Sequence, residues 1–253
     1  MTTEYTGSSE MFIAHLTIEG EHFRMTSSVT VPAGPVQVSD LLPLARALSD
    51  AIVRETCQAV KDAGEKISCT TSGCGSCCRN LVPISEVEAR CTHDVVEKLP
   101  EPRHSHVRAR FAEARQRLER TGLLDKLLAA DRLTNEDYTA LVGTYFQHGI
   151  PCPFLEEESC SIYQERPIAC REYLVTSPPE CCAKLGSEGV QQVRLPLRLF
   201  NAVARWQVPP QEHFLERWVP LIMAPEWAEA HPDDPPPKPG PELLQELLDH
   251  LKS

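Results

Sequence analysis

Eleven cysteines stand out among the 253 residues of the chain, and nine of them fall into two groups. Block one comprises Cys69, Cys74, Cys77 and Cys78, and block two comprises Cys152, Cys160, Cys170, Cys181 and Cys182. Two residues separate Cys74 from Cys77, which allows a tight turn that directs two thiolates to one ion, as at zinc and iron–sulfur sites. Gly73 and Gly75 allow close backbone approach and leave amide groups free to donate to sulfur. We therefore favour a metal site over a set of structural or free thiols.

The number of metal sites stays open at this point. Nine thiols suffice for one four-coordinate site with spare ligands or for two nearly separate sites. Cys77 and Cys78 are adjacent and cannot point the same way on an extended chain. Either the backbone turns sharply there, or the pair serves two metals, or one of the two is not a ligand. The segment between the blocks has a mostly helical pattern, and we expect it to bring both blocks to a shared site.

The other two cysteines and the three tryptophans are predicted to pack in the core. Cys57 lies on one helical face with valines, as does Cys91, and a free cysteine there acts as a small hydrophobic residue. Trp206, Trp218 and Trp227 lie in an apolar C-terminal region. We expect them to pack against helices rather than to stack on a cofactor.

Three arginines lie beside cysteines: Arg79, Arg166 and Arg171. A four-thiolate site with zinc or a four-iron cluster carries a formal charge of about −2, which guanidinium groups would offset while donating hydrogen bonds. The alternative is that these arginines form surface ion pairs with Glu165, Glu172 or Glu180. The sequence does not favour one interpretation over the other.

Composition limits the partners. Lys and Arg number 25 and Asp and Glu 36, which gives a formal net charge of −11 and disfavours a nucleic-acid partner. No run approaches the roughly 20 apolar residues that span a bilayer. The N-terminal residues lack the basic start and apolar core of a signal peptide. We expect a cytoplasmic protein with reduced thiols and no membrane association, and an unknown protein partner stays open.

Periodicity and turn residues predict the elements that position the cysteines. We expect a polar, frayed stretch over 1–10 and two strands within 11–33. Helices are predicted at 39–63, from a Ser85/Glu88 capping box onward, and at 105–120, 123–130 and 134–148. Block two is expected on a hairpin with arms 150–155 and 160–163, followed by a short helix from Arg166-Pro167. A strand at 190–194 and a helix near 196–206 follow.

The pattern as a whole predicts a mainly helical α+β fold with an N-terminal β-hairpin, a cysteine-rich metal-site domain and a Pro-linked C-terminal helix. Four segments are expected: 1–65 hairpin and helix, 66–183 metal-binding domain, 184–231 strand and helix extension, 232–253 Pro-rich linker and terminal helix. Six prolines between His231 and Pro241 indicate a stiff linker. We expect that truncation after His231 leaves folding and metal content unchanged.

The motifs resemble those of a known family. Cys69, then Cys74-Gly75-Ser76-Cys77-Cys78-Arg79, followed by Cys152-Pro153-Phe154-Leu155, Cys160-Ser161-Ile162-Tyr163 and Cys170-Arg171-Glu172-Tyr173, resemble the YkgJ-type cysteine-cluster proteins. This family is described as a zinc- or iron-chelating CxxCxxCC domain or as iron–sulfur-cluster-containing proteins, and the resemblance spans about residues 66–183. It implies the following metal ligands: Cys69, Cys74, Cys77, Cys78, Cys152, Cys160 and Cys170, with Cys181 or Cys182 as a further one.

Three functions are compatible with this resemblance. The first is a metalloprotein that binds an iron–sulfur cluster or Zn²⁺, with iron–sulfur slightly favoured because the donors are all thiolates. The second is a methyl- or group-transferring enzyme that resembles the flagellin lysine N-methylase branch of the family. The third is a structural zinc module that supports a protein–protein interface. No reaction, substrate or catalytic residue follows from the sequence.

Overall fold

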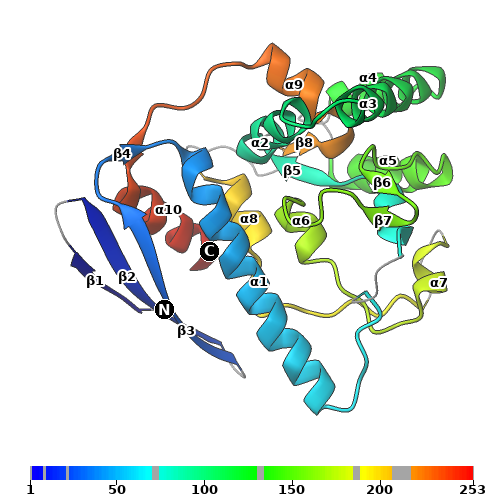
Figure 1. The fold of residues 1–253 in the computed structure, drawn as a ribbon. Coiled ribbons are helices and arrows are strands. Elements are labelled where there is room, and N and C mark those ends of the chain that lie inside the picture. Colours follow the sequence, from blue (N-terminus) through cyan, green and yellow to red (C-terminus); the bar gives the residue numbers. More distant parts are fainter. Residues whose placement is uncertain are drawn as a thin grey trace.

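The computed structural model describes residues 2–7, 10–20, 23–69, 74–129, 134–184, 189–206 and 218–252. Helices dominate, with a few short strands beside them, so the predicted mainly helical α+β class is confirmed (Figure 1). No helix in these ranges is long and apolar enough to cross a membrane.

A three-stranded antiparallel sheet forms the N-terminal part. Its strands are β1 (Thr2–Gly7), β2 (Met11–Gly20) and β3 (Phe23–Pro32), in the order β1-β2-β3. Alternation in β2 places Ala14, Leu16 and Ile18 in the core. The two strands predicted within 11–33 are confirmed. The expectation of a frayed start is wrong, because β1 pairs along its whole length with β2.

Helix α1 (Val38–Asp62) packs across this sheet. Its first turn differs slightly from the prediction, because the helix is capped at Gln37, whose amide N–H donates to Asp40 Oδ2 at 2.9 Å. The helix ends where predicted, with Gly64 at a φ of +83° that glycine adopts without steric cost. The residues of α1 that repeat every three or four positions are buried, among them Leu41, Leu48 and Ile52.

The C-terminal helix α10 (Gly240–Lys252) docks on the same core. Strand β9 (Lys238–Pro239) pairs with β4 (Pro35–Val36) and brings the helix against α1, α8 (Leu199–Ala204) and β3 (Figure 1). The buried leucines of α10 are Leu243, Leu244, Leu247, Leu248 and Leu251. The tail is thus part of the core, which removes the basis for expecting that it can be truncated without effect. The effect of truncation and the boundaries of the four segments remain predictions.

A second helical layer carries the other apolar clusters. It contains β5 (Pro83–Ser85), α2 (Glu86–Glu97), α3 (Arg103–Arg120), α4 (Leu124–Leu128), α5 (Asn135–Gln147), β8 (Trp218–Pro220), η4 (Leu221–Met223) and α9 (Ala224–Ala230). The predicted capping box is present, since Glu88 N–H donates to Ser85 Oγ and Ser85 N–H to Glu88 Oε2. Trp206 and Trp218 are buried as expected.

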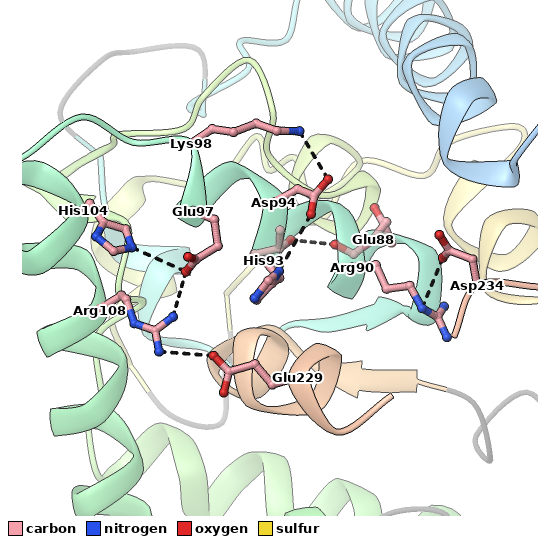
Figure 2. Close-up of polar contacts among 11 residues, drawn as sticks. Glu88, Arg90, His93, Asp94, Glu97, Lys98, His104, Arg108, Glu229 and Asp234 are labelled. Atoms are coloured by element: carbon pink, nitrogen blue, oxygen red, sulfur yellow. Dashed lines mark hydrogen bonds and ion pairs between the residues drawn. The ribbon is translucent and has the colours of Figure 1, made fainter. Parts of the chain in front are cut away.

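Polar contacts on the surface hold this layer together (Figure 2). Arg108 of α3 bridges Glu97 of α2 and Glu229 of α9 at 2.7 and 3.1 Å. Arg90 of α2 lies 3.4 Å from Asp234, in the proline-rich stretch before α10. This ion pair connects the proline-rich stretch to α2 before the chain continues to α10.

The elements that carry or flank the two cysteine blocks are short. They are the 3-10 helix η1 (Ser76–Arg79), β6 (Leu155–Glu156), β7 (Ser159–Cys160), α6 (Ile168–Arg171) and α7 (Pro179–Cys182). The hairpin lies in the predicted place but has two-residue arms joined through Glu157 and Glu158, both at positive φ. The strand predicted at 190–194 is reduced to one bridge between Val175 and Gln192. The helix expected near 196–206 is α8, which begins only at Leu199.

Candidate metal centre

The two cysteine blocks meet in the structure. The amide N–H of Cys152 donates to the carbonyl of Cys78 at 2.7 Å. Gly75 lies so close to the hairpin that a Cβ there would come within 2.6 Å of Leu155 Cδ1 and 2.7 Å of Glu158 Oε2. A larger residue at this position would displace the ends of both side chains and crowd Glu158 Cα at 3.2 Å, so glycine favours the close approach of the blocks.

The turn of η1 resolves the question of the adjacent cysteines. The backbone turns sharply there, because Cys77 and Cys78 both lie in the 3-10 helix. A side-chain hydrogen bond from Cys78 lowers the pKa of Cys77 to about 7, with further help from the backbone and from Arg166. The same contact raises the pKa of Cys78, because Cys78 must keep its proton to donate it. Cys77 is thus the thiol most readily converted to a thiolate.

Backbone amides act on three of the sulfurs. Val175 N–H donates to Cys69 Sγ at 3.2 Å. The N–H groups of Phe154 and Ile162, each two residues after its cysteine, lower the pKa of Cys152 and Cys160. Such hydrogen bonds stabilise the negative charge of metal-bound thiolates.

Burial surrounds the inner thiols. Burial raises the pKa of Cys170 well above its usual range and that of Cys152 to about 12. The neighbouring thiols of Cys77 and Cys160 raise both pKa values further. Cys170 interacts electrostatically with Cys152, Cys77 and Cys160, so these four thiols share one interior region. Cys152, Cys160 and Cys170, whose pKa values are raised, keep their protons without a metal, and a bound metal would displace them.

A second set of thiols lies at the edge of this region. Cys69 interacts with Cys77, Cys182 and Cys74, and burial raises the pKa of Cys69 to about 11. Helix α7 packs against η1, and Cys182 there is buried and interacts with Cys74 and Cys77. The sulfur of Cys181 lies near Gly189, at 3.9 Å from the position that a Cβ would take there.

The thiols lie in the same region, but their side chains do not form a complete coordination shell. Within the described residues, no group of three or more His, Cys, Asp or Glu side chains is spaced to hold a metal ion. The donor chemistry nevertheless fits zinc or an iron–sulfur cluster, since soft thiols converge in a buried region supplied with amide donors. Small rotations of these side chains would have to complete a coordination shell.

The three arginines beside the cysteines have different roles. Arg166 lies near enough to lower the pKa of Cys77 and Cys160, and its guanidinium stacks 3.8 Å from the ring of Tyr163. Arg79 makes a two-pronged ion pair with Glu158, at 2.9 and 2.6 Å. Arg166 therefore stabilises the thiolate forms of Cys77 and Cys160, whereas Arg79 links block one to the hairpin.

Arg171 supports the fold rather than the sulfurs. It is buried, pairs with Asp50 of α1 at 2.6 Å and donates to the carbonyls of Gln164 and Arg166. Within the part of the chain that the structure describes, none of the three arginines forms an ion pair with Glu165, Glu172 or Glu180.

Sequence reasoning missed several residues that shape the site. Tyr173 interacts with Cys182, Cys77 and Cys69, and burial raises its pKa. Glu88, predicted only as a cap of α2, also accepts the Ile168 N–H at 2.7 Å and so fixes the start of α6. No local signal in the sequence announces either contact, because each joins segments far apart in the chain.

Cys57 and Cys91 lie outside the thiol group, as predicted. Cys57 packs against a small apolar cluster around Ile67, and Cys91 packs against the large N-terminal core. Burial raises the pKa of both thiols.

Residues 68–184 match a family model, CxxCxxCC, described as a putative zinc- or iron-chelating domain. The matched range begins just before Cys69 and ends just after Cys182, so it contains both blocks. Residues 68–184 are therefore similar to the CxxCxxCC domain, for which zinc or iron chelation is the described property. Neither the curated proteins nor the solved structures contain a match to this chain.

Proposed function

We propose that thiolates from both blocks hold one metal centre, an iron–sulfur cluster or a zinc ion. The observation that carries the proposal is the meeting of the blocks, where Cys152 N–H donates to the Cys78 carbonyl and the partly buried thiols of Cys77, Cys152, Cys160 and Cys170 interact. Four thiols from segments more than 70 residues apart come together in a protein without disulfides, and a bound metal explains this arrangement.

The proposed ligand set also includes cysteines beyond these four. Cys78 belongs to it through its contact with Cys77, and Cys69 and Cys74 lie at the edge. At α7 we prefer Cys182 to Cys181, because Cys182 faces Cys74 and Cys77.

An all-thiolate set slightly favours an iron–sulfur cluster, although zinc accepts four thiolates equally well. A cluster would supply one-electron transfer, and zinc would supply a cross-link between the blocks. The residues of the chain exclude water, donate amide hydrogen bonds to sulfur and place Arg166 beside the negative charge. All eleven cysteines are free thiols, which supports a reducing compartment such as the cytoplasm.

Anaerobic purification with metal analysis and a visible absorption spectrum tests the proposal. Broad visible absorption with bound iron identifies a cluster, and colourless protein with stoichiometric zinc identifies a zinc site. Cys170→Ser should lose the metal, whereas the matched control Cys57→Ser should keep it. Protein without any metal, or equal loss in both variants, would contradict the proposal.

A further inference from the structure

Helix α3 presents one face to the cysteine hairpin, defined here as residues 152–162. Val107 and Phe111 of α3 are buried in the same apolar cluster as Phe154 of the hairpin. The rings of Phe111 and Phe154 meet edge to face, with centroids 5.4 Å apart and an interplanar angle of 80°. The hairpin is therefore seated on α3 by apolar contact.

Two arginines flank this apolar seat. Arg103 Nη2 donates to the carbonyl of Ser161 at 2.6 Å. Arg110 Nη1 donates to the carbonyls of Pro153 and Leu155 at 3.3 and 3.4 Å. The two arginines are seven residues apart, which places them two helical turns apart on the same face. Arg110 therefore contacts the first arm of the hairpin and Arg103 the second.

The carbonyls that they bind belong to the peptide groups that follow the two hairpin cysteines. The carbonyl of Pro153 and the N–H of Phe154 form one peptide group, and this N–H lowers the pKa of Cys152. The carbonyl of Ser161 and the N–H of Ile162 form another, and its N–H lowers the pKa of Cys160. A peptide group is planar, so fixing its carbonyl also fixes the direction of its N–H.

A charged donor on the carbonyl also polarises the peptide group. Hydrogen bonds in such a chain strengthen one another, so an arginine on the oxygen makes the N–H a better donor to sulfur. The chain of contacts runs from guanidinium to carbonyl, through the peptide group, and from N–H to thiolate. It occurs twice, once for each cysteine of the hairpin.

We propose that Arg103 and Arg110 are positioning residues of the metal centre, which orient and polarise the two peptide groups that donate to Cys152 and Cys160. The inference rests on the proposed metal-binding function. It assigns α3, a helix without cysteines, a direct part in tuning the thiolates. Groups that act on metal ligands in this way typically change metal affinity by about ten- to a hundredfold when they are lost.

Cobalt loading of the full chain tests the inference. The protein is stripped of metal and reloaded with Co²⁺ alone under reducing, anaerobic conditions. The thiolate-to-cobalt charge-transfer absorption is then recorded, together with the rate at which a chelator removes the metal. Arg103→Ala and Arg110→Ala should shift the charge-transfer band and release cobalt about ten- to a hundredfold faster than the unchanged protein.

The matched control is Arg117→Ala. Arg117 lies on the same helix and donates to a backbone carbonyl, that of His148, which is not part of a peptide group next to a cysteine. This variant should keep the spectrum and the release rate, even if its melting temperature falls. Arg103→Lys and Arg110→Lys retain one cationic donor and should partly restore the slow release. They also serve as the test if an alanine variant does not fold.

The outcomes separate the two claims. If the unchanged protein binds cobalt and the Arg103 and Arg110 variants match Arg117→Ala in spectrum and release rate, the positioning role is wrong and the metal site stands. If the unchanged protein takes up no cobalt, iron or zinc, the proposed function and the inference both fall. A band shift without rescue by lysine would also overturn the inference, because it would show a general disturbance of the helix.

Discussion

Replacement of Leu247 by alanine tests the docking of the C-terminal helix on the core. Leu247 of α10 has no exposed surface and belongs to the cluster that unites the N-terminal sheet, α1 and α8. Removing a fully buried leucine side chain loses apolar burial and leaves a cavity, at a cost of about 2–5 kcal/mol. In a chain of this size, 1 kcal/mol lowers the melting temperature by about 2–4 °C, so we expect a fall of roughly 4–20 °C.

Thermal and denaturant unfolding, followed by circular dichroism, measure this effect. Leu128→Ala is the matched control, because it removes the same atoms from α4 at a position that is 60% exposed. We expect that control to change stability by less than about 0.5 kcal/mol. If Leu247→Ala melts together with Leu128→Ala, α10 does not stabilise the core and the reasoning is refuted.

Three further predictions follow from the same structure. Truncation after His231 should prevent stable folding, because about 1.5–3 kcal/mol for each of the buried leucines of α10 approaches the whole stability of a domain; a truncated protein that melts like the full chain would contradict this. Cys69→Ser should retain more metal than Cys74→Ser by metal analysis, because four residues separate Cys69 from Cys74, whereas only two separate Cys74 from Cys77; the reverse order would make Cys69 a central ligand. A strong chelator should speed amide exchange in α2 and α5, because metal ligands come from both ends of the segment that contains these helices; unchanged exchange would show that folding does not depend on the metal.

The sequence determined the features that depend on near neighbours in the chain. The capping box of Ser85 and Glu88 and the end of α1 before Gly64 were predictable because their interactions lie within a few residues. The pairing of β2 with β3 was predictable because a short segment joins two strands with alternating apolar residues. The donor type of the site was predictable for the same reason. A cysteine-rich loop with flanking glycines needs only its own residues to favour thiolate binding of a soft metal.

Predictions failed where the sequence carried no local signal. Residues 2–7 contain little apolar sequence, and they form β1 because β2 offers them an unpaired edge. The proline-rich stretch before α10 is typical of a linker, yet it leads to the leucines that complete the N-terminal core. In both cases the partner segment, rather than local propensity, decides the structure.

The sequence by itself thus indicated which residues are candidate metal ligands and how the short turns around them are built. Only the tertiary structure decided that the two blocks meet, that Cys182 interacts with Cys74 and Cys77, and that Arg103 and Arg110 bind the carbonyls of Ser161 and Pro153. The physical reason is the range of the interactions. Turns and caps are set over three or four residues, whereas these contacts join segments about 45 to more than 100 residues apart, and only the packing of the helices between them brings such segments together.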